Sequence, residues 1–288
     1  MRNLWINFTI FSFFIRSLII NPLKVILVLS QYYVHLIKGK KIIIQKIPML
    51  DNYKMVLDLN SHFDRSIFFS GLLGKHVEND IFTFLKKNLK KDSVFFEVGS
   101  NSGYFSLLAS LIAKCGSTHA FEPVPHTYIN FKKSLELNDI KNIKLNNACV
   151  GDKNGIKKFY VSFHSDVSGL KVTRYQKRNK VIKSKMVTLN SYCKENKIKK
   201  LDIIKIDTEG AEKKIIFGSK NVFRKFHPKI IIEFCNKTAE PFGYHPNEVY
   251  DFLAKLGYTA HKWDGKSLKI QFKKDYYEDE DLFFTYEN

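Results

Sequence analysis

The sequence predicts an α/β protein with a doubly wound, Rossmann-like sheet and an apolar helical extension at its N-terminus. Short apolar runs alternate with amphipathic segments from about residue 94 onward, which is typical of parallel strands joined by crossover helices. The first of these runs, Val94-Phe-Phe-Glu-Val-Gly, passes through a glycine turn into the helical pattern that begins at Tyr104. A doubly wound sheet usually builds its ligand site on such a strand–turn–helix unit.

Apolar periodicity and turn residues give the order of the elements. Before the first core strand, Glu78 to Leu89 has helical spacing, and residues 43–65 are expected to be irregular or short-stranded. The acidic stretch from Asp275 to Asp281 is expected to be a solvated turn. Strands are predicted at 94–98, 118–122, 143–149, 156–162, 181–187, 202–207, 229–234, 258–263 and 268–273, and helices at 104–114, 125–137, 190–197, 211–217 and 247–256.

The beginning of the chain differs in composition, so we expect residues 1–50 to form the extension and residues 51–288 the α/β domain. The extension holds three apolar runs, Asn3 to Ile15, Ser17 to Leu23 and Val25 to Ile37. Each is shorter than the roughly 18 to 20 residues that span a bilayer, and no small-residue cleavage site follows the first. Two alternatives stay open: the segments cap the domain, or they lie on a membrane surface with lysines among the headgroups.

The charge and the cysteines limit the class of protein. The formal net charge is +19, but the excess is mostly lysine, and the arginines that usually read phosphates and bases are few and scattered. We therefore expect no nucleic-acid partner. The cysteines Cys115, Cys149, Cys193 and Cys235 lie far apart without a C-x-x-C pair, which argues against zinc and against a disulfide framework. Reduced thiols favour the cytoplasm, with membrane association through the N-terminus as an option.

The glycine turn indicates the kind of cofactor. Dinucleotide sites use G-x-G-x-x-G, whereas this turn has Gly99 and Gly103 separated by three residues, with Glu97 just before it. A carboxylate there repels a pyrophosphate but suits the ammonium and sulfonium of S-adenosylmethionine (SAM). The expected cofactor-binding set is Glu97, Gly99, Ser100, Asn101 and Gly103 along the methionine end, Glu122 on the ribose hydroxyls, and Asn147 and Ala148 near the adenine. A local turn cap is an equal alternative for Asn147.

Asp207 and Glu209 end an apolar strand close to where the methyl group of SAM is expected. Burying unpaired carboxylates is costly, so two acids at this place favour a role in orienting or deprotonating an acceptor hydroxyl. The alternative for Asp207 is a cap on the helix that starts near Ala211. His164, in a polar loop, is a third candidate catalytic residue, and His126 a weaker one. No metal is expected, because no histidine lies near these acids in the sequence.

Four blocks of sequence together resemble the FkbM family of SAM-dependent methyltransferases over roughly Gly71 to Phe234. They are Glu97-Val-Gly-Ser-Asn-Ser-Gly, Phe121-Glu-Pro-Val-Pro, Leu201-Asp-Ile-Ile-Lys-Ile-Asp-Thr-Glu-Gly-Ala-Glu212 and Pro228-Lys-Ile-Ile-Ile-Glu233. The chain departs from the family at Glu97, where the family usually has Asp, and at Asn190, where it tends to have Asp.

The resemblance implies O-methylation of a hydroxyl on a saccharide, glycolipid or similar natural product. The residues alone support transfer to oxygen weakly, through the absence of the Asn/Asp-Pro-Pro-aromatic run of many nitrogen methyltransferases. One alternative is a non-catalytic methyltransferase-like module that binds a membrane surface or RNA, but the intact Gly99, Gly103 and Glu122 argue against a decayed cofactor site. The other, an NAD-binding oxidoreductase, is disfavoured by the missing third glycine and by Glu97.

Overall fold

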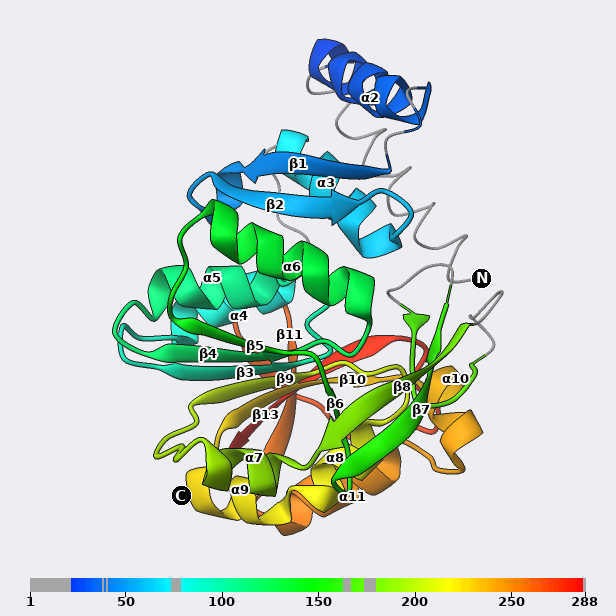
Figure 1. Cartoon of the computed structure of the whole chain (residues 1–288). Coiled ribbons are helices and arrows are strands. Elements are labelled where there is room, and N and C mark those ends of the chain that lie inside the picture. The colour runs from blue at the N-terminus through cyan, green and yellow to red at the C-terminus, as the bar shows by residue number, and fades with distance from the viewer. Residues whose placement is uncertain are drawn as a thin grey trace.

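A mixed eight-stranded sheet forms the centre of the computed structural model, which describes residues 22–37, 39, 41–73, 79–162, 167–173 and 180–286 (Figure 1). The strand order is β12-β11-β13-β10-β9-β3-β4-β5, and β10, β9, β3, β4 and β5 run parallel. The strands are β3 (Val94–Val98), β4 (Ser117–Phe121), β5 (Ile143–Asn146), β9 (Ile203–Ile206), β10 (Lys229–Phe234), β11 (Tyr258–Trp263), β12 (Leu268–Ile270) and β13 (Glu280–Tyr286).

Helices cover both faces of this sheet, which confirms the predicted doubly wound α/β fold. Successive strand residues point to opposite faces, so Phe95 joins the core on one side of β3 and Phe96 the core on the other. The first face carries α4 (Asn79–Asn88), α5 (Tyr104–Ile112) and α6 (Pro125–Leu137); the second carries α7 (Leu189–Glu195), α8 (Glu212–Gly218), α9 (Lys220–Phe226) and α11 (Asn247–Lys255).

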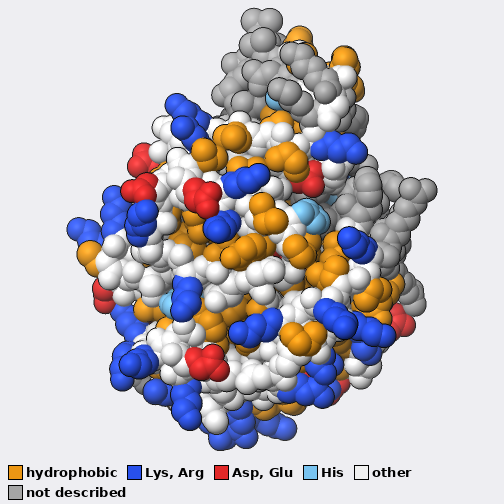
Figure 2. All heavy atoms as spheres, viewed as in Figure 1, with side chains coloured by type: hydrophobic (Ala, Val, Ile, Leu, Met, Phe, Trp, Pro, Cys, Tyr) orange, Lys and Arg blue, Asp and Glu red, His pale blue; other side chains and the backbone are white. Residues whose placement is uncertain are grey.

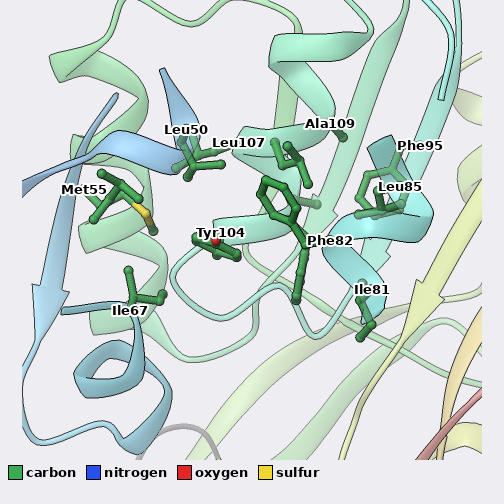
Figure 3. Packing of buried hydrophobic residues seen from close by; sticks show 14 of the residues in the cluster. Leu50, Met55, Ile67, Ile81, Phe82, Leu85, Phe95, Tyr104, Leu107 and Ala109 are labelled. Carbon is green, nitrogen blue, oxygen red and sulfur yellow. The ribbon is translucent and has the colours of Figure 1, made fainter. Parts of the chain in front are cut away.

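A hairpin and two helices form an additional layer beyond α6. The region expected to be irregular or short-stranded contains two short strands and the start of a helix: β1 (Ile42–Ile47), η1 (Pro48–Leu50), β2 (Tyr53–Asp58) and α3 (His62–Leu73), with α2 (Pro22–Ile37) packed on α3. The Val56 amide donates to Ser134 Oγ on α6 at 2.9 Å. Leu50, Met55 and Ile67 share one core with Phe82, Phe95 and Tyr104 (Figure 3). Position 50, the expected boundary, lies in the turn of this hairpin, and residues 1–21 of the expected extension lie outside the described residues.

A small second sheet projects from the C-terminal edge of the main one. It contains β6 (Cys149–Val150), β8 (Lys180–Val187) and β7 (Gly155–Val161), in that order. The expected strand 143–149 is therefore two strands in two sheets, because the chain leaves the main sheet after Asn146. After β10 the chain forms α10 (Asn236–Ala239) and η3 (Glu240–Phe242) at the same edge.

The expectation of a solvated turn over residues 275–281 was wrong for the last two residues of that stretch. Glu280 begins β13, which inserts antiparallel between β10 and β11. Leu282 and Phe283 are buried on opposite faces of the sheet, so an apolar run decided the structure over the acids that precede it. Lys262 and Lys274 pair with Glu280 at 3.0 and 2.7 Å, which balances its charge. Among the helices of the described ranges, none combines the length and hydrophobicity that a bilayer crossing requires.

Gly103 should be intolerant of a side chain for steric reasons. Its φ is +86°, and an added Cβ would meet the fully buried Phe131 ring at 2.2 Å. We expect Gly103→Ala to lower the free energy of unfolding by about 3 kcal/mol, from overpacking and backbone strain together. Gly265 also has a positive φ but nothing within 4 Å, so Gly265→Ala should cost about 1 kcal/mol. Equal costs in urea denaturation would contradict the packing argument.

Candidate active site

The order of the strands reverses between β3 and β9, and the predicted site residues meet there. From β3 the chain continues to β4 and β5 on one side, whereas β9 and β10 lie on the other. Open α/β sheets bind ligands beyond the carboxyl ends of the strands at such a point. Gly99 has a φ of +83°, and a Cβ on it would lie 1.8 Å from the backbone oxygen of Asp207. The two strand ends can approach this closely because residue 99 is glycine.

Backbone hydrogen bonds join the glycine turn to the end of β4. The amides of Gly99 and Ser100 both donate to the Phe121 carbonyl, at 3.1 and 3.0 Å. Asn101, with a φ of +48°, donates its amide to Glu122 Oε2 at 2.9 Å, and the Val124 amide donates to Oε1 at 2.8 Å. Each carboxylate oxygen keeps a further lone pair, so Glu122 can still accept hydrogen bonds from a ligand.

Burial has the largest effect on the pKa values of Glu122 and Glu97, the two acids beside the glycine turn. Desolvation raises the pKa of Glu122 to about 7, against the two amide hydrogen bonds that favour its charged form. Desolvation also raises the pKa of Glu97 to about 7, although the Lys205 ammonium and the hydrogen bond from Ser106 Oγ oppose the rise. Both carboxylates therefore titrate near neutral pH.

The buried polar atoms around the turn fit a ligand with its own charged groups. Ser100 is 2% exposed, and its hydroxyl has no hydrogen-bond partner among the described residues. The Thr127 hydroxyl at the start of α6 is also buried without a hydrogen-bond partner among the described residues. A buried hydroxyl without a partner is costly unless a ligand or water supplies one. The amino-acid end of SAM offers such partners, so this half of the site fits the cofactor expected from the sequence.

Asn147 and Ala148 follow β5 and lie next to this turn. Asn147 Nδ2 donates to the Glu122 carbonyl at 2.9 Å, so its amide braces the chain around the acid. This is the local role that the sequence left open. Ala148 is buried. A contact of either residue with adenine stays a prediction.

Three carboxylates gather on the β9 side of the reversal point. Asp207, Glu209 and Glu233 each offer an oxygen within 4.8 Å of the others. Lys205 Nζ lies 2.8 Å from Asp207 Oδ2, and the lysine side chain is 4% exposed. Carboxylate oxygens are ligands that hard divalent cations accept, so this set could hold a metal ion. No metal was expected from the sequence, and the ammonium of Lys205 already balances part of the negative charge.

Glu212 holds the loop that carries these acids. Its Oε1 accepts from the Thr208 amide at 2.8 Å, the Thr208 hydroxyl at 2.7 Å and the Gly210 amide at 3.3 Å. Tyr244 donates its hydroxyl to Oε2 at 3.1 Å. Glu209, between the two bonded amides, has a φ of +56°, a conformation costly for a residue with a side chain. We call these four hydrogen bonds to Glu212 the Glu212 clamp. They hold the loop on both sides of Glu209 and so fix its strained backbone conformation.

Some site residues were missed from the sequence, and others lie elsewhere than expected. The N-cap position of α8 is Ala211, so Asp207 is not the N-cap residue of this helix. Glu212 had no assigned role, and Lys205 was overlooked although a lysine inside an apolar strand signals a buried ion pair. His126 is exposed at the start of α6. His164 lies outside the described residues.

An open pocket of about 620 Å³ lies where the segment after β10 meets the start of α11. It is lined by Asn236, Lys237, Glu240, Gly243, Tyr244, His245, Glu248 and Tyr276. Tyr244 connects it to the Glu212 clamp, and a Cβ on Gly210 would lie 2.1 Å from the Thr238 carbonyl of α10. The loop of Asp207 and Glu209 therefore contacts the elements that line the pocket.

Comparison with known proteins decides the family. The model of the methyltransferase FkbM domain matches residues 97–260, more than half of the chain. The chain belongs to the FkbM methyltransferase family. It is thus a SAM-dependent methyltransferase, as the four sequence blocks predicted. The matched range contains every predicted site residue.

Other relatives of this FkbM methyltransferase are distant. "Methyltransferase 1" of Beauveria bassiana (strain ARSEF 2860) is 20% identical over 169 residues, which cover 52% of this chain and 67% of the relative. Among solved structures, precorrin-6y C5,15-methyltransferase of Geobacter metallireducens GS-15 has a TM-score of 0.43 at 14% identity, covering 74% of this chain and 90% of that one. A Streptococcus mutans protein in complex with SAH also scores 0.43, at 13% identity over 73% and 98%.

Glu122 should control cofactor affinity and its pH dependence. In the wild type, both carboxylate oxygens of Glu122 accept a hydrogen bond from a backbone N–H group. In Glu122→Gln, the side-chain NH2 replaces one of these oxygens, so two donors face each other. We expect affinity for S-adenosylhomocysteine at pH 8 to fall about 10- to 100-fold, the value of one or two hydrogen bonds to a charged group. Wild-type affinity should also weaken as pH drops below about 7, because protonation removes the acceptor charge. Calorimetry measures both, with exposed Glu136→Gln as the control; full affinity of Glu122→Gln would rule out this role.

Ionisation of the buried Glu97 should lower the free energy of unfolding. Its folded-state pKa is about 7 against an ordinary value of 4.5, so the penalty is absent in acid and grows as pH rises between these values. We expect Glu97→Gln to raise the free energy of unfolding by up to about 3 kcal/mol at pH 8 and by little at pH 5. Thermal denaturation across this range checks the crossover. A gain that is independent of pH would show that packing, not charge, is responsible.

Proposed function

We propose that this FkbM methyltransferase transfers the methyl group of SAM to a hydroxyl of a saccharide, glycolipid or similar natural product. The main support is the pair of carboxylates, Asp207 and Glu209, that follow β9. They lie next to the glycine turn, which follows the adjacent strand β3. Asp207 abuts Gly99 through its backbone, so a methyl donor held over the turn lies beside the acids. Methyl transfer to oxygen needs alignment and a proton acceptor at this place.

The cofactor half of the site is assigned to the turn and the two buried acids. Glu122 accepts from the ribose hydroxyls with its remaining lone pairs, while Asn101 and Val124 hold it in position. The Ser100 hydroxyl meets the amino-acid end of the cofactor. Glu97 supplies negative charge beneath that end. SAM itself supplies an electrophilic methyl group on a sulfonium.

The acceptor half is assigned to Asp207 and Glu209. Lys205 pairs with one oxygen of Asp207, while the Asp207 side chain is 32% exposed and open to an acceptor. Asp207 accepts the hydroxyl proton as the oxygen–methyl bond forms and the methyl–sulfur bond breaks. Glu209, fixed by the Glu212 clamp, orients the hydroxyl. His164 is an additional candidate for the base.

The pocket beside α10 supports an acceptor rich in hydroxyl groups. Its exposed Tyr276 offers an aromatic face, and Glu240, Glu248 and Asn236 offer hydrogen-bond acceptors. A flat aromatic ring with polar groups around it suits a sugar, which presents C–H faces and hydroxyl edges. This lining is the specific support for a saccharide portion.

Substitution of the two acids separates chemistry from cofactor binding. We expect Asp207→Asn to lower kcat about 10²- to 10⁴-fold with a sugar acceptor, because the proton loses its acceptor. Affinity for S-adenosylhomocysteine should change less than about threefold, since the turn and Glu122 are intact. Glu209→Gln should act mainly on the KM of the acceptor.

The control is Asp139→Asn, an aspartate whose side chain is 84% exposed. Transfer of a labelled methyl group from SAM to a panel of saccharides and glycolipids provides the rate. If Asp207→Asn methylates at the wild-type rate, another residue is the base and the assignment is wrong.

A further inference from the structure

Apolar side chains cover the outer face of α2. Ile26, Tyr33 and Ile37 are 57%, 58% and 84% exposed, and their spacing of seven and four residues places them on one side of the helix. The opposite side is packed: the Tyr32 ring lies 6.1 Å from Phe68 and 5.1 Å from Phe69, both on α3. The helix is thus anchored to the protein by one face and presents a second apolar face to the outside.

Strand β1, which like α2 packs on α3, also exposes apolar side chains. Ile43 and Ile47 point inward, whereas Ile42 and Ile44 on the other face are 47% and 61% exposed. Figure 2 shows hydrophobic side chains over the hairpin in the upper part of the molecule, with lysine or arginine side chains beside them. We call Ile26, Tyr33, Val34, Ile37, Ile42 and Ile44 the N-terminal apolar surface.

The sequence that forms most of this surface is basic, although Asp58 on β2 pairs across from Ile42. The first fifty residues contain no Asp or Glu, although the whole chain has 28. Their basic residues are Arg2, Arg16, Lys24, Lys38, Lys40, Lys41 and Lys46. Lys41 and Lys46 are exposed on and next to β1, and Lys54 on β2 pairs across from Lys46. An apolar face with an excess of exposed lysines beside it matches a membrane with anionic headgroups.

We propose that the N-terminal apolar surface is a docking site for an anionic lipid bilayer. The exposed isoleucines and Tyr33 enter the boundary between headgroups and acyl chains, and the lysines contact lipid phosphates. Docking is peripheral, since none of the described helices can cross a bilayer. A second copy of the chain is a poor occupant, because self-pairing would bring two cationic surfaces together. The proposal does not depend on the acceptor.

Vesicle flotation of the full chain tests this site. We expect binding to vesicles of phosphatidylcholine mixed with phosphatidylglycerol, little binding to phosphatidylcholine alone, and weakening by salt. The double variant Tyr33→Ser/Ile37→Ser should bind about tenfold more weakly or worse, through lost apolar burial. Lys41→Gln/Lys46→Gln should lose about fivefold per lysine. Binding of S-adenosylhomocysteine, measured on each variant, verifies that the domain is folded.

The matched control is Ile270→Ser/Phe272→Ser, which removes two apolar residues that are 63% and 76% exposed at the opposite end of the sheet. It should bind vesicles as the wild type does. The proposal is overturned if the wild type floats with neither vesicle, or if Ile270→Ser/Phe272→Ser loses as much binding as Tyr33→Ser/Ile37→Ser. It is also overturned if light scattering shows a dimer that Tyr33→Ser/Ile37→Ser dissociates while no vesicle is bound.

Discussion

The contact between Gly99 and the backbone of Asp207 is the constraint on which the rest of the site depends. With any side chain at residue 99, the ends of β3 and β9 would have to separate. One side of the contact leads through Asn101 to Glu122, and the other leads through Lys205 to the three carboxylates. A single glycine thus keeps cofactor-binding and acceptor-binding groups in one place.

The site concentrates negative charge where the solvent cannot stabilise it. Glu97, Glu122 and Glu212 are all nearly inaccessible, and burial raises the pKa of each. Hydrogen bonds offset part of this cost: two backbone amides for Glu122, and two amides and two hydroxyls for Glu212. Such a cost in folding stability is usual where a protein preorganises groups for a ligand.

Sequence patterns predicted the elements whose boundaries are set locally. The bounds of β3, α6, β10 and β11 agree with expectation because glycine, proline or a change of periodicity marks each end. Short strands were one expectation for residues 43–65, where β1 and β2 form, but strand β13 was not predicted, because it forms only through pairing with β10 and β11. Leu282 and Phe283 gave only a short apolar signal after a run of acids, and nothing nearby indicates that β10 and β11 lie on either side of them.

The same distinction applies to the site. The turn, Glu122 and the acids after β9 were visible in the sequence because they follow strand ends in a recognisable order. Glu233 was a weaker candidate for the acceptor side, and its approach to Asp207 follows from the pairing of β10 with β9. Glu212 was hidden for another reason. It follows the loop that it stabilises, and a carboxylate in the first turn of a helix is usually interpreted as a favourable interaction with the helix dipole.

The position of β13 has a consequence for how the chain folds as it leaves the ribosome. β10 and β11 are synthesised first, but the strand that joins them in the sheet comes after both. Until residues 280–286 emerge, the nascent sheet ends at β10 with an open hydrogen-bonding edge, and β11 is paired only with β12 on its other side. Folding must finish after translation of this region, and the exposed edge in the meantime is a natural substrate for chaperones.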